Sequence, residues 1–324
     1  MTRFNSFVRP CLVLLALLVG VAPSAFAQVD QQRVLVALPA VYALTSALGE
    51  GTHIEVVRVP LDAATPMESQ ANVLSRLDPA VFQNAVAVVT LNSLWRADPL
   101  YATARRHNLR IVEIDASHSW DGLKPGVAVT RVPTNDVPWA GARNAEAGPS
   151  PYAWLSPINA MRMSALIAAD LARLSPSDAP RITRNLAALD GRIRQLKADY
   201  GDRLLKVPDL RVLSLSSEPV YLLGEFGVYV DGWFVRQDID WTDADRSALS
   251  RYLRERDIRV VVHKWAPDAG IVKAIEDGGA RLLILDIGNP GLLANTASSY
   301  EALLSSNLDA LLATFAGVQA ATPQ

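Results

Sequence analysis

The feature that most constrains the fold is a long amphipathic stripe between Asp178 and Leu205. Apolar residues recur there at steps of three or four, the spacing of one face of an α-helix. They are Ile182, Leu186, Leu189, Ile193, Leu196, Tyr200 and Leu204. Asp178 is expected to cap this helix, with Pro180 in its first turn and Pro208 beyond its end. At about 1.5 Å per residue it would extend roughly 35–40 Å, so we interpret it as a rigid strut joining two α/β lobes rather than a helix packed inside one domain.

Segments on both sides of the stripe alternate between strand and helix patterns, which is typical of parallel sheets covered by helices. In the first lobe we expect strands at 33–38, 54–59, 85–91 and 110–114, and helices at 40–48, up to about 77, at 95–107 and at 157–174. In the second lobe we expect strands at 211–215, 228–235, 259–263 and 281–285, and helices at 218–226, 243–256, 268–277 and 299–315. Residues 115–150, rich in proline and glycine, are expected to form a long loop. The predicted fold class is α/β: two lobes, each with a mostly parallel sheet flanked by helices, joined by one long rigid linking helix.

The first 27 residues have the pattern of a secretory signal peptide. Arg3 and Arg9 precede an apolar run at 11–21 that is too short to span a bilayer. Residues 25–27 are Ala-Phe-Ala, which has the pattern of a signal-peptide cleavage site. The alternative is an uncleaved membrane anchor. The predicted domains are a signal peptide at 1–27, an N-terminal lobe at 28–177, the linking helix at 178–206, a C-terminal lobe at 207–317 and a disordered tail at 318–324. The expected location is the periplasm.

Composition argues against several classes of function. The net charge is −2 and no basic run is present, so nothing indicates nucleic acid or an acidic membrane surface as a partner. The single cysteine, Cys11, lies in the signal segment, which leaves the mature chain without a thiolate for catalysis or zinc. The sequence has no Ser–His–Asp spacing, nucleophile elbow or His-x-x-x-His pair, so an enzyme is the least favoured class.

Polar and aromatic residues follow the ends of several expected strands, where open α/β sheets bind their ligands. They are Pro66, Met67 and Glu68 after the second strand, Tyr152 and Trp154 before the helix at 157, Ser216, Ser217 and Glu218 after the strand at 211–215, and Asp286 after the last strand. An exported chain of two α/β lobes without a catalytic motif is therefore expected to bind a ligand between the lobes.

These residues carry a resemblance to the metal-binding solute-binding proteins of bacterial ABC importers, the zinc and manganese cluster with a rigid linking helix. The similarity covers nearly all of 33–316. Its most specific part is Pro-Tyr-Ala-Trp-Leu-Ser-Pro at 151–157, which resembles the family's Asp-Pro-His-x-Trp-x-(Ser/Asp)-Pro. Residues 66–68 fall where the family has Pro-His-(Asp/Ser), Ser216 falls where it has His or Glu, and Asp286 matches its Asp ligand. The helix from Tyr300 resembles the family's terminal helix.

The resemblance implies that Met67, Tyr152, Ser216 and Asp286 occupy the metal-ligand positions. It also implies a divalent metal, zinc or manganese, as the cargo, an ABC permease in the inner membrane as the partner, and a monomer. Only Asp286 keeps a residue type that suits zinc or manganese. A thioether and two neutral hydroxyls beside one carboxylate predict poor zinc binding, and the identity of the metal stays open.

Glu68, Glu218 and His118 are the additional candidate ligands. The two carboxylates would suit a harder cation, the alternative being solvated charges at loop ends. Met67 would suit a soft ion such as Cu(I) or would pack in the core. His118 is the only histidine of the long loop, where the family has a histidine-rich one. His263 is expected at the edge of a lobe rather than as a ligand.

Several aromatic residues leave a further alternative open. They are Tyr152, Trp154, Trp233, Trp241 and Trp265. A cleft lined by them would suit an organic ligand or a metal chelate, although each tryptophan can also be buried for structural reasons. We predict a periplasmic solute-binding protein that captures a metal ion or metal chelate and delivers it to a permease without performing chemistry. The alternatives are an envelope accessory or interaction protein that has lost metal binding, and a binder of a small organic ligand.

Overall fold

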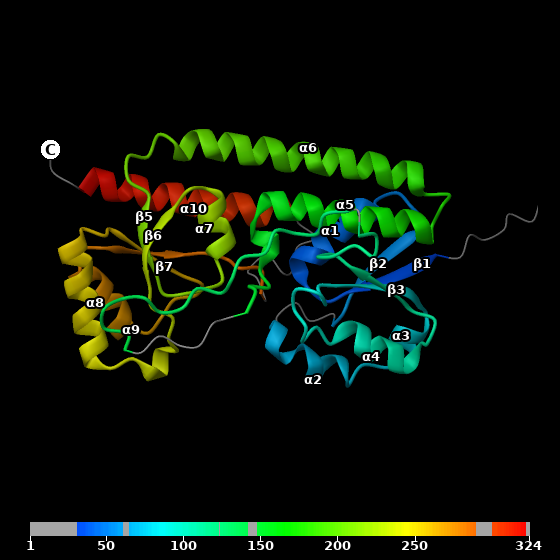
Figure 1. The fold of residues 1–324 in the computed structure, drawn as a ribbon, viewed down its shortest axis with the longest axis horizontal. Helices are drawn as coiled ribbons and strands as arrows, with labels where there is room; N and C mark the ends of the chain where they lie inside the picture. The colour runs from blue at the N-terminus through cyan, green and yellow to red at the C-terminus, as the bar shows by residue number, and fades with distance from the viewer. Residues whose placement is uncertain (1–30, 61–64, 123, 142–147, 290–299, 322–324) are drawn as a thin grey trace, which may run out of the picture. The chain divides into compact units, whose positions relative to one another are not determined.

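The computed structural model describes residues 31–60, 65–122, 124–141, 148–289 and 300–321, and in them the chain forms two four-stranded sheets (Figure 1). The first sheet has the order β2-β1-β3-β4 and the second the order β6-β5-β7-β8, with every neighbouring pair parallel. The strands are β1 Gln32–Val36, β2 Ile54–Arg58, β3 Ala85–Thr90, β4 Val112–Asp115, β5 Arg211–Ser214, β6 Tyr229–Trp233, β7 Val260–His263 and β8 Arg281–Ile284. Each lies within two residues of a predicted strand, and the predicted fold class is confirmed.

Helices cover both sheets. They are α1 Pro39–Gly49, α2 Gln70–Leu74, α3 Ala80–Gln83, α4 Leu100–His107, α5 Pro157–Leu174, α6 Ala179–Leu204, α7 Val220–Glu225, α8 Asp243–Arg256, α9 Ala269–Asp277 and α10 Tyr300–Ala321, with single 3₁₀ turns at Met67–Ser69, Ala153–Leu155 and Asp238–Asp240. None of the helices in these described segments combines the length and apolar composition needed to cross a membrane.

Several helices differ from the prediction in their limits or in being present at all. The short helix α3 was not predicted. The helix expected from Trp95 begins only at Leu100, because the Asp98 carboxylate accepts hydrogen bonds from the backbone N–H groups of Leu91 and Leu100, at 3.0 Å each, and fixes a turn before it. The last helix continues to Ala321, past its expected end at Phe315 and into the tail that was expected to be disordered from 318.

The long helix α6 packs against helices from both sides of the molecule. It contacts α1 and α5 over the first sheet and α10 beside the second, as Figure 1 shows for α5 and α10. Its apolar stripe is buried at Ile182, Leu189 and Ile193. These side chains belong to one hydrophobic cluster that also contains Val34 of β1 and Val212 of β5. The apolar stripe of α6 therefore belongs to one hydrophobic core that includes residues of both sheets.

Asp178 does not cap α6, which corrects the sequence-based expectation. Its backbone is already in the right-handed helical region, and its side chain makes no capping hydrogen bond. The carboxylate accepts hydrogen bonds from Ser175 Oγ at 2.7 Å and from the backbone N–H of His53 at 3.0 Å, and it lies 3.0 Å from His53 Nδ1. Asp178 therefore ties the turn between α5 and α6 to the segment before β2. Ser156 and Thr242 do cap helices: their hydroxyls accept from backbone N–H groups in the first turns of α5 and α8.

Part of the long loop crosses to the second sheet. Asn135 Oδ1 accepts a hydrogen bond from the backbone N–H of Val235 at 2.6 Å, and Asp136 exchanges two hydrogen bonds with Trp233 at the end of β6. Val137 is buried in a second hydrophobic cluster, separate from the one that contains the stripe of α6. A Cβ at Gly232 would lie 2.7 Å from Val137 Cγ1, so glycine is required for this close approach. The predicted domain limits themselves stay a prediction.

Candidate functional site

Three segments that were expected to carry ligands meet at the side chain of Asn289, in the turn after β8. Asn289 Oδ1 accepts a hydrogen bond from the backbone N–H of Met67 at 2.8 Å, and Nδ2 donates to the Tyr152 hydroxyl at 3.1 Å. Asp286 lies in the same turn, and its Oδ1 accepts from the backbone N–H of Gly288 at 2.8 Å. The structure therefore ties the segments of Met67 and Tyr152, through the amide of Asn289, to the turn that contains Asp286.

The turn at 286–289 is held in place by two other elements. Asn307 of α10 accepts from the backbone N–H of Asp286 and donates to its carbonyl, both at 2.7 Å. Trp154 Nε1 donates to the Ile287 carbonyl at 2.9 Å, and the indole is fully buried. Because Trp154 follows β4 in the chain and Ile287 follows β8, this hydrogen bond joins the two sheets.

Tyr152 is 7% exposed and packs edge-on against Trp154, with ring centroids 5.2 Å apart. Burial raises the pKa of the Tyr152 phenol well above its usual value, and the charges of Glu218 and Glu68 raise it further, against the hydrogen bond from Asn289. The phenol is therefore protonated at neutral pH. Both carboxylates lie near enough to Tyr152 to act on it electrostatically, although Glu68 itself is exposed.

Ser216 and Glu218 form a separate cluster with Lys264. Ser216 Oγ accepts from the backbone N–H of Lys264 at 3.0 Å, and Glu218 forms a short ion pair with the Lys264 ammonium. The Glu218 side chain is only 12% exposed, so it is not the solvated charge of the alternative interpretation. Ser216 is buried and has a structural hydrogen bond. Lys264 also lies over the Trp265 ring, with Nζ 4.3 Å from the ring centroid.

His263 is buried at the end of β7, an interior strand, rather than exposed at the edge of a lobe. Its Nδ1 accepts from the backbone N–H groups of Lys264 at 2.9 Å and Trp265 at 3.1 Å. Burial lowers the pKa of His263 to about 4, although the charges of Asp238 and Glu218 oppose this shift. The imidazole is neutral at pH 7, and its Nδ1 lone pair is already occupied.

The remaining candidates separate into core and surface residues. Met67 is buried in the hydrophobic cluster that contains the stripe of α6, which agrees with the alternative that its side chain packs in the core. Trp241 is buried in the second cluster against Phe234, whereas Trp265 is 48% exposed beside Lys264. His118 is exposed and lies close to Gly126 of the same loop.

The donor set fits a bare zinc ion poorly. Within the described residues, no group of three or more His, Cys, Asp or Glu side chains is placed to hold a metal ion. Zinc prefers imidazole, thiolate or carboxylate ligands in a tetrahedron. Of the four described residues at the family's ligand positions, Met67 offers a buried thioether, Tyr152 a protonated phenol and Ser216 a hydrogen-bonded hydroxyl, so Asp286 is the one whose side chain zinc prefers.

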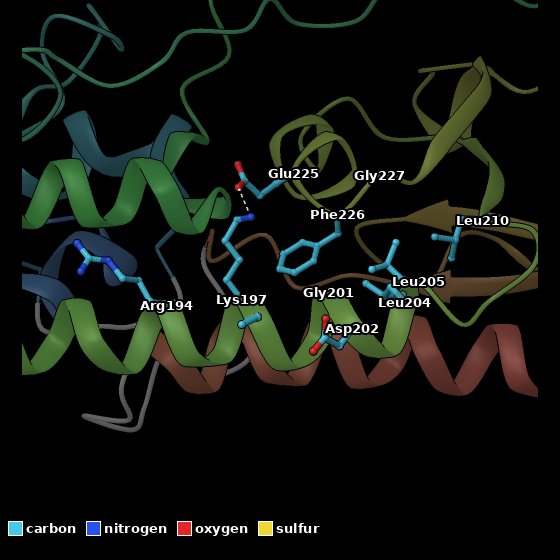
Figure 2. Close-up of a pocket in the computed structure, with 11 residues that line it drawn as sticks. Arg194, Lys197, Gly201, Asp202, Leu204, Leu205, Leu210, Glu225, Phe226 and Gly227 are labelled. Atoms are coloured by element: carbon cyan, nitrogen blue, oxygen red, sulfur yellow. Dashed lines mark ion pairs between the residues drawn. The ribbon is translucent and has the colours of Figure 1, made fainter.

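A groove of about 530 Å³ lies apart from this site, between α6 and the end of α7 (Figure 2). Figure 2 shows Lys197 directed at Glu225, whose Oε1 lies 3.3 Å from the ammonium. The other carboxylate oxygen accepts from Ser156 Oγ at 2.9 Å. Glu225, the last residue of α7, therefore ties the N-terminus of α5 to the side of α6, and we assign it a structural role.

Asn289 and Lys264 are the two residues that sequence reasoning missed. The side-chain partners of Asn289 lie far away in the chain. Lys264 carries no motif that would mark it in the sequence. Lys264 directly follows β7, at a strand end where parallel sheets bind ligands, whereas no sequence signal of this kind marks Asn289.

Solved structures show the same fold. FpvC from Pseudomonas aeruginosa, solved in complex with Mn²⁺, is 22% identical with a TM-score of 0.66, over 89% of this chain and 99% of that one. A periplasmic metal-binding protein from Candidatus Liberibacter asiaticus is 18% identical with a TM-score of 0.67, over 88% and 99%. Zn(II)-bound AdcA from Streptococcus pneumoniae is 16% identical with a TM-score of 0.67, over 88% of this chain and 58% of that one. At these identities the likeness is one of fold.

Sequence comparison gives the family. No curated protein sequence matches the chain. The family model of the periplasmic component A of the zinc-uptake complex matches residues 34–314, which is most of the 324 residues. The chain therefore belongs to the family of zinc-uptake complex component A periplasmic proteins.

Proposed function

We propose that this protein captures a metal ion or a metal chelate between its two sheets and delivers it to an ABC permease in the inner membrane. The observation that carries the proposal is the convergence of Met67, Tyr152 and the 286–289 turn on Asn289, in a chain of a periplasmic metal-uptake family. Two segments of the first sheet and one of the second contribute to this site. Such a site suits a cargo held between two bodies.

The candidate contact residues have different roles. Asp286 is the best metal ligand of the site, and Tyr152 and Met67 line it. Glu68 adds negative charge near the Tyr152 phenol, which would favour the metal of a bound cargo, whereas the charge of Glu218 is balanced by Lys264. Ser216 contributes indirectly because its hydroxyl orients the backbone of Lys264. We infer a divalent metal as the transported element, as in the Mn²⁺ and Zn(II) complexes of the structural relatives.

The remaining elements of the proposal come from the sequence and the family. Export through a cleavable signal at 1–27 would place the mature protein in the periplasm. It would act as a monomer and perform no chemistry on its cargo. A second candidate, an envelope interaction protein that has lost metal binding, is favoured by the lack of a three-ligand group within the described residues.

Replacing Asp286 by asparagine should remove the stabilisation that cargo gives. In the wild type, cargo at one hundred times its Kd should raise the free energy of unfolding by about 2.7 kcal/mol. Asparagine keeps an acceptor for the Gly288 N–H but loses the charge that binds a cation. We expect the increase in melting temperature with zinc, manganese or their citrate complexes to disappear in Asp286→Asn. Melting curves and metal analysis of protein purified without chelator measure this.

Asp309→Asn is the matched control, since Asp309 lies on α10 and pairs with Arg203 instead. It should keep the full metal-dependent shift. A wild-type protein that shows no shift with any of these metals or complexes would favour the interaction protein. A full shift in Asp286→Asn would remove Asp286 from the ligand set while leaving metal capture intact.

A further inference from the structure

The hydrogen bonds of Asn289 fix the direction of the hydrogen bond to Tyr152. The backbone N–H of Met67 can only donate, so the Asn289 atom 2.8 Å from it must be the carbonyl Oδ1. The amide nitrogen then faces the Tyr152 hydroxyl at 3.1 Å and has only hydrogens to offer. The phenol oxygen is therefore the acceptor, and its own hydrogen is not used in this bond.

No acceptor for this hydroxyl hydrogen exists among the residues that the structure describes; the one hydrogen bond of the Tyr152 hydroxyl is the one it accepts from Asn289. The side chain is 93% buried, because its relative exposure is 7%. Buried polar hydrogens almost always have a hydrogen-bond acceptor. A buried hydrogen without an acceptor lowers the stability of the protein, and a ligand that supplies one recovers this free energy. The site thus contains a donor for which a bound molecule would supply the acceptor.

The phenol cannot rotate freely away from this arrangement. Its ring packs edge-on against Trp154, which is held by the Ile287 carbonyl through Nε1. The Tyr300 hydroxyl donates to the Trp154 carbonyl at 2.6 Å and fixes the backbone of the same segment. The position of the donor is therefore set by packing before any cargo enters.

A bare cation is a poor partner for this group. The phenol oxygen already accepts from Asn289, and its O–H dipole presents a positive end to a cation. An anionic oxygen, such as a carboxylate of a chelating molecule, is a good partner because hydrogen bonds to charged acceptors are short and strong. The half-exposed face of Trp265, beside the Lys264–Glu218 ion pair, offers an aromatic surface that suits an organic molecule.

We propose that Tyr152, positioned by Asn289, recognises an oxygen acceptor on an organic chelator, so that the metal is captured as its chelate rather than as a bare ion. The proposal rests on the proposed function and names the class of its cargo. Asn289 is a positioning residue that acts through Tyr152. Asp286 remains the residue closest in type to a metal ligand and would contact the metal side of the complex.

Titration calorimetry with zinc chloride, zinc citrate and citrate alone tests the proposal on the full mature chain. We expect the wild type to bind zinc citrate at least tenfold more tightly than zinc alone. Tyr152→Phe keeps the ring against Trp154 and removes only the donor. Its affinity for zinc citrate should fall roughly tenfold or more, the effect of losing one hydrogen bond to a charged acceptor, with little change for zinc alone.

Two further variants make the result specific. Tyr152→His supplies an imidazole, which suits zinc, and should raise the affinity for zinc alone relative to zinc citrate. Tyr101→Phe removes a hydroxyl on α4 that accepts from Arg105, outside the site, and should behave as the wild type. Circular dichroism and melting temperature establish that each variant is folded.

The outcomes separate the chelate proposal from metal capture. Equal binding of zinc citrate by the wild type and Tyr152→Phe, or tighter binding of zinc alone by the wild type, overturns the chelate proposal and leaves metal capture intact. Binding of citrate as tightly as zinc citrate supports the oxygen acceptor but overturns the metal chelate. If the wild type binds neither zinc nor zinc citrate, the proposed function fails and the chelate proposal fails with it.

Discussion

Replacing Trp154 by alanine should lower the free energy of unfolding by about 3–5 kcal/mol, the usual cost of removing a large buried aromatic side chain. The indole is fully buried and lies in the cluster that contains residues of both sheets. It also donates to the Ile287 carbonyl, which would be left without this partner. The loss should be visible as a lower midpoint in urea unfolding monitored by circular dichroism.

A graded series separates the two contributions of Trp154. Trp154→Phe retains most of the buried surface and loses the indole N–H, so we expect a loss of about 1–3 kcal/mol from the unpaired Ile287 carbonyl and the small cavity. Trp120→Ala is the control, because Trp120 is 80% exposed and should change the free energy of unfolding by less than about 0.5 kcal/mol. Equal losses for Trp154→Ala and Trp120→Ala would contradict the assigned packing.

Acidification should destabilise the protein through His263. The pKa of this imidazole is about 4 in the folded protein against 6.5 for an unperturbed histidine. Since the folded state has the lower pKa, the unfolded state takes up the proton first, and stability is lost as the pH falls from about 6.5 to 4. Over this range the contribution is on the order of 3 kcal/mol.

His263→Asn isolates this contribution. The asparagine Oδ1 can replace Nδ1 as the acceptor for the backbone N–H groups of Lys264 and Trp265, and it does not titrate. The difference in unfolding free energy between wild type and variant should therefore shrink, or change sign, between pH 7 and pH 4.5. Urea unfolding at both values measures it. His118→Asn, which removes an exposed imidazole, should keep the wild-type acid loss, and parallel profiles for wild type and His263→Asn would contradict the assignment.

Local patterns were sufficient to predict most of the fold. The stripe from Ile182 to Leu204 predicted α6 because helical periodicity and burial are both properties of one short segment. The crossing of the long loop to β6 was not predicted, because Asn135 and Asp136 are held by hydrogen bonds to residues about one hundred positions away. The pattern of a proline-rich segment contains no information on such partners.

The candidate site was predicted only in part. Resemblance to the family pointed to Tyr152 and Asp286, and the structure places both segments at Asn289. Their roles in binding stay a prediction. Asn289 itself could not be found from the sequence, since its bonds to Met67 and Tyr152 span 222 and 137 residues. The buried state of His263 likewise depends on helices and loops that pack around the end of β7.

The position of the metal in crystals grown with zinc or zinc citrate tests the central claim most directly, through anomalous scattering at the zinc edge. The account predicts a peak in the space shared by Asp286, Tyr152 and Asn289, with a chelator oxygen in contact with the Tyr152 hydroxyl. A peak at another place, such as the groove beside Lys197 and Glu225, with these three side chains in no contact with metal or chelator, would contradict it.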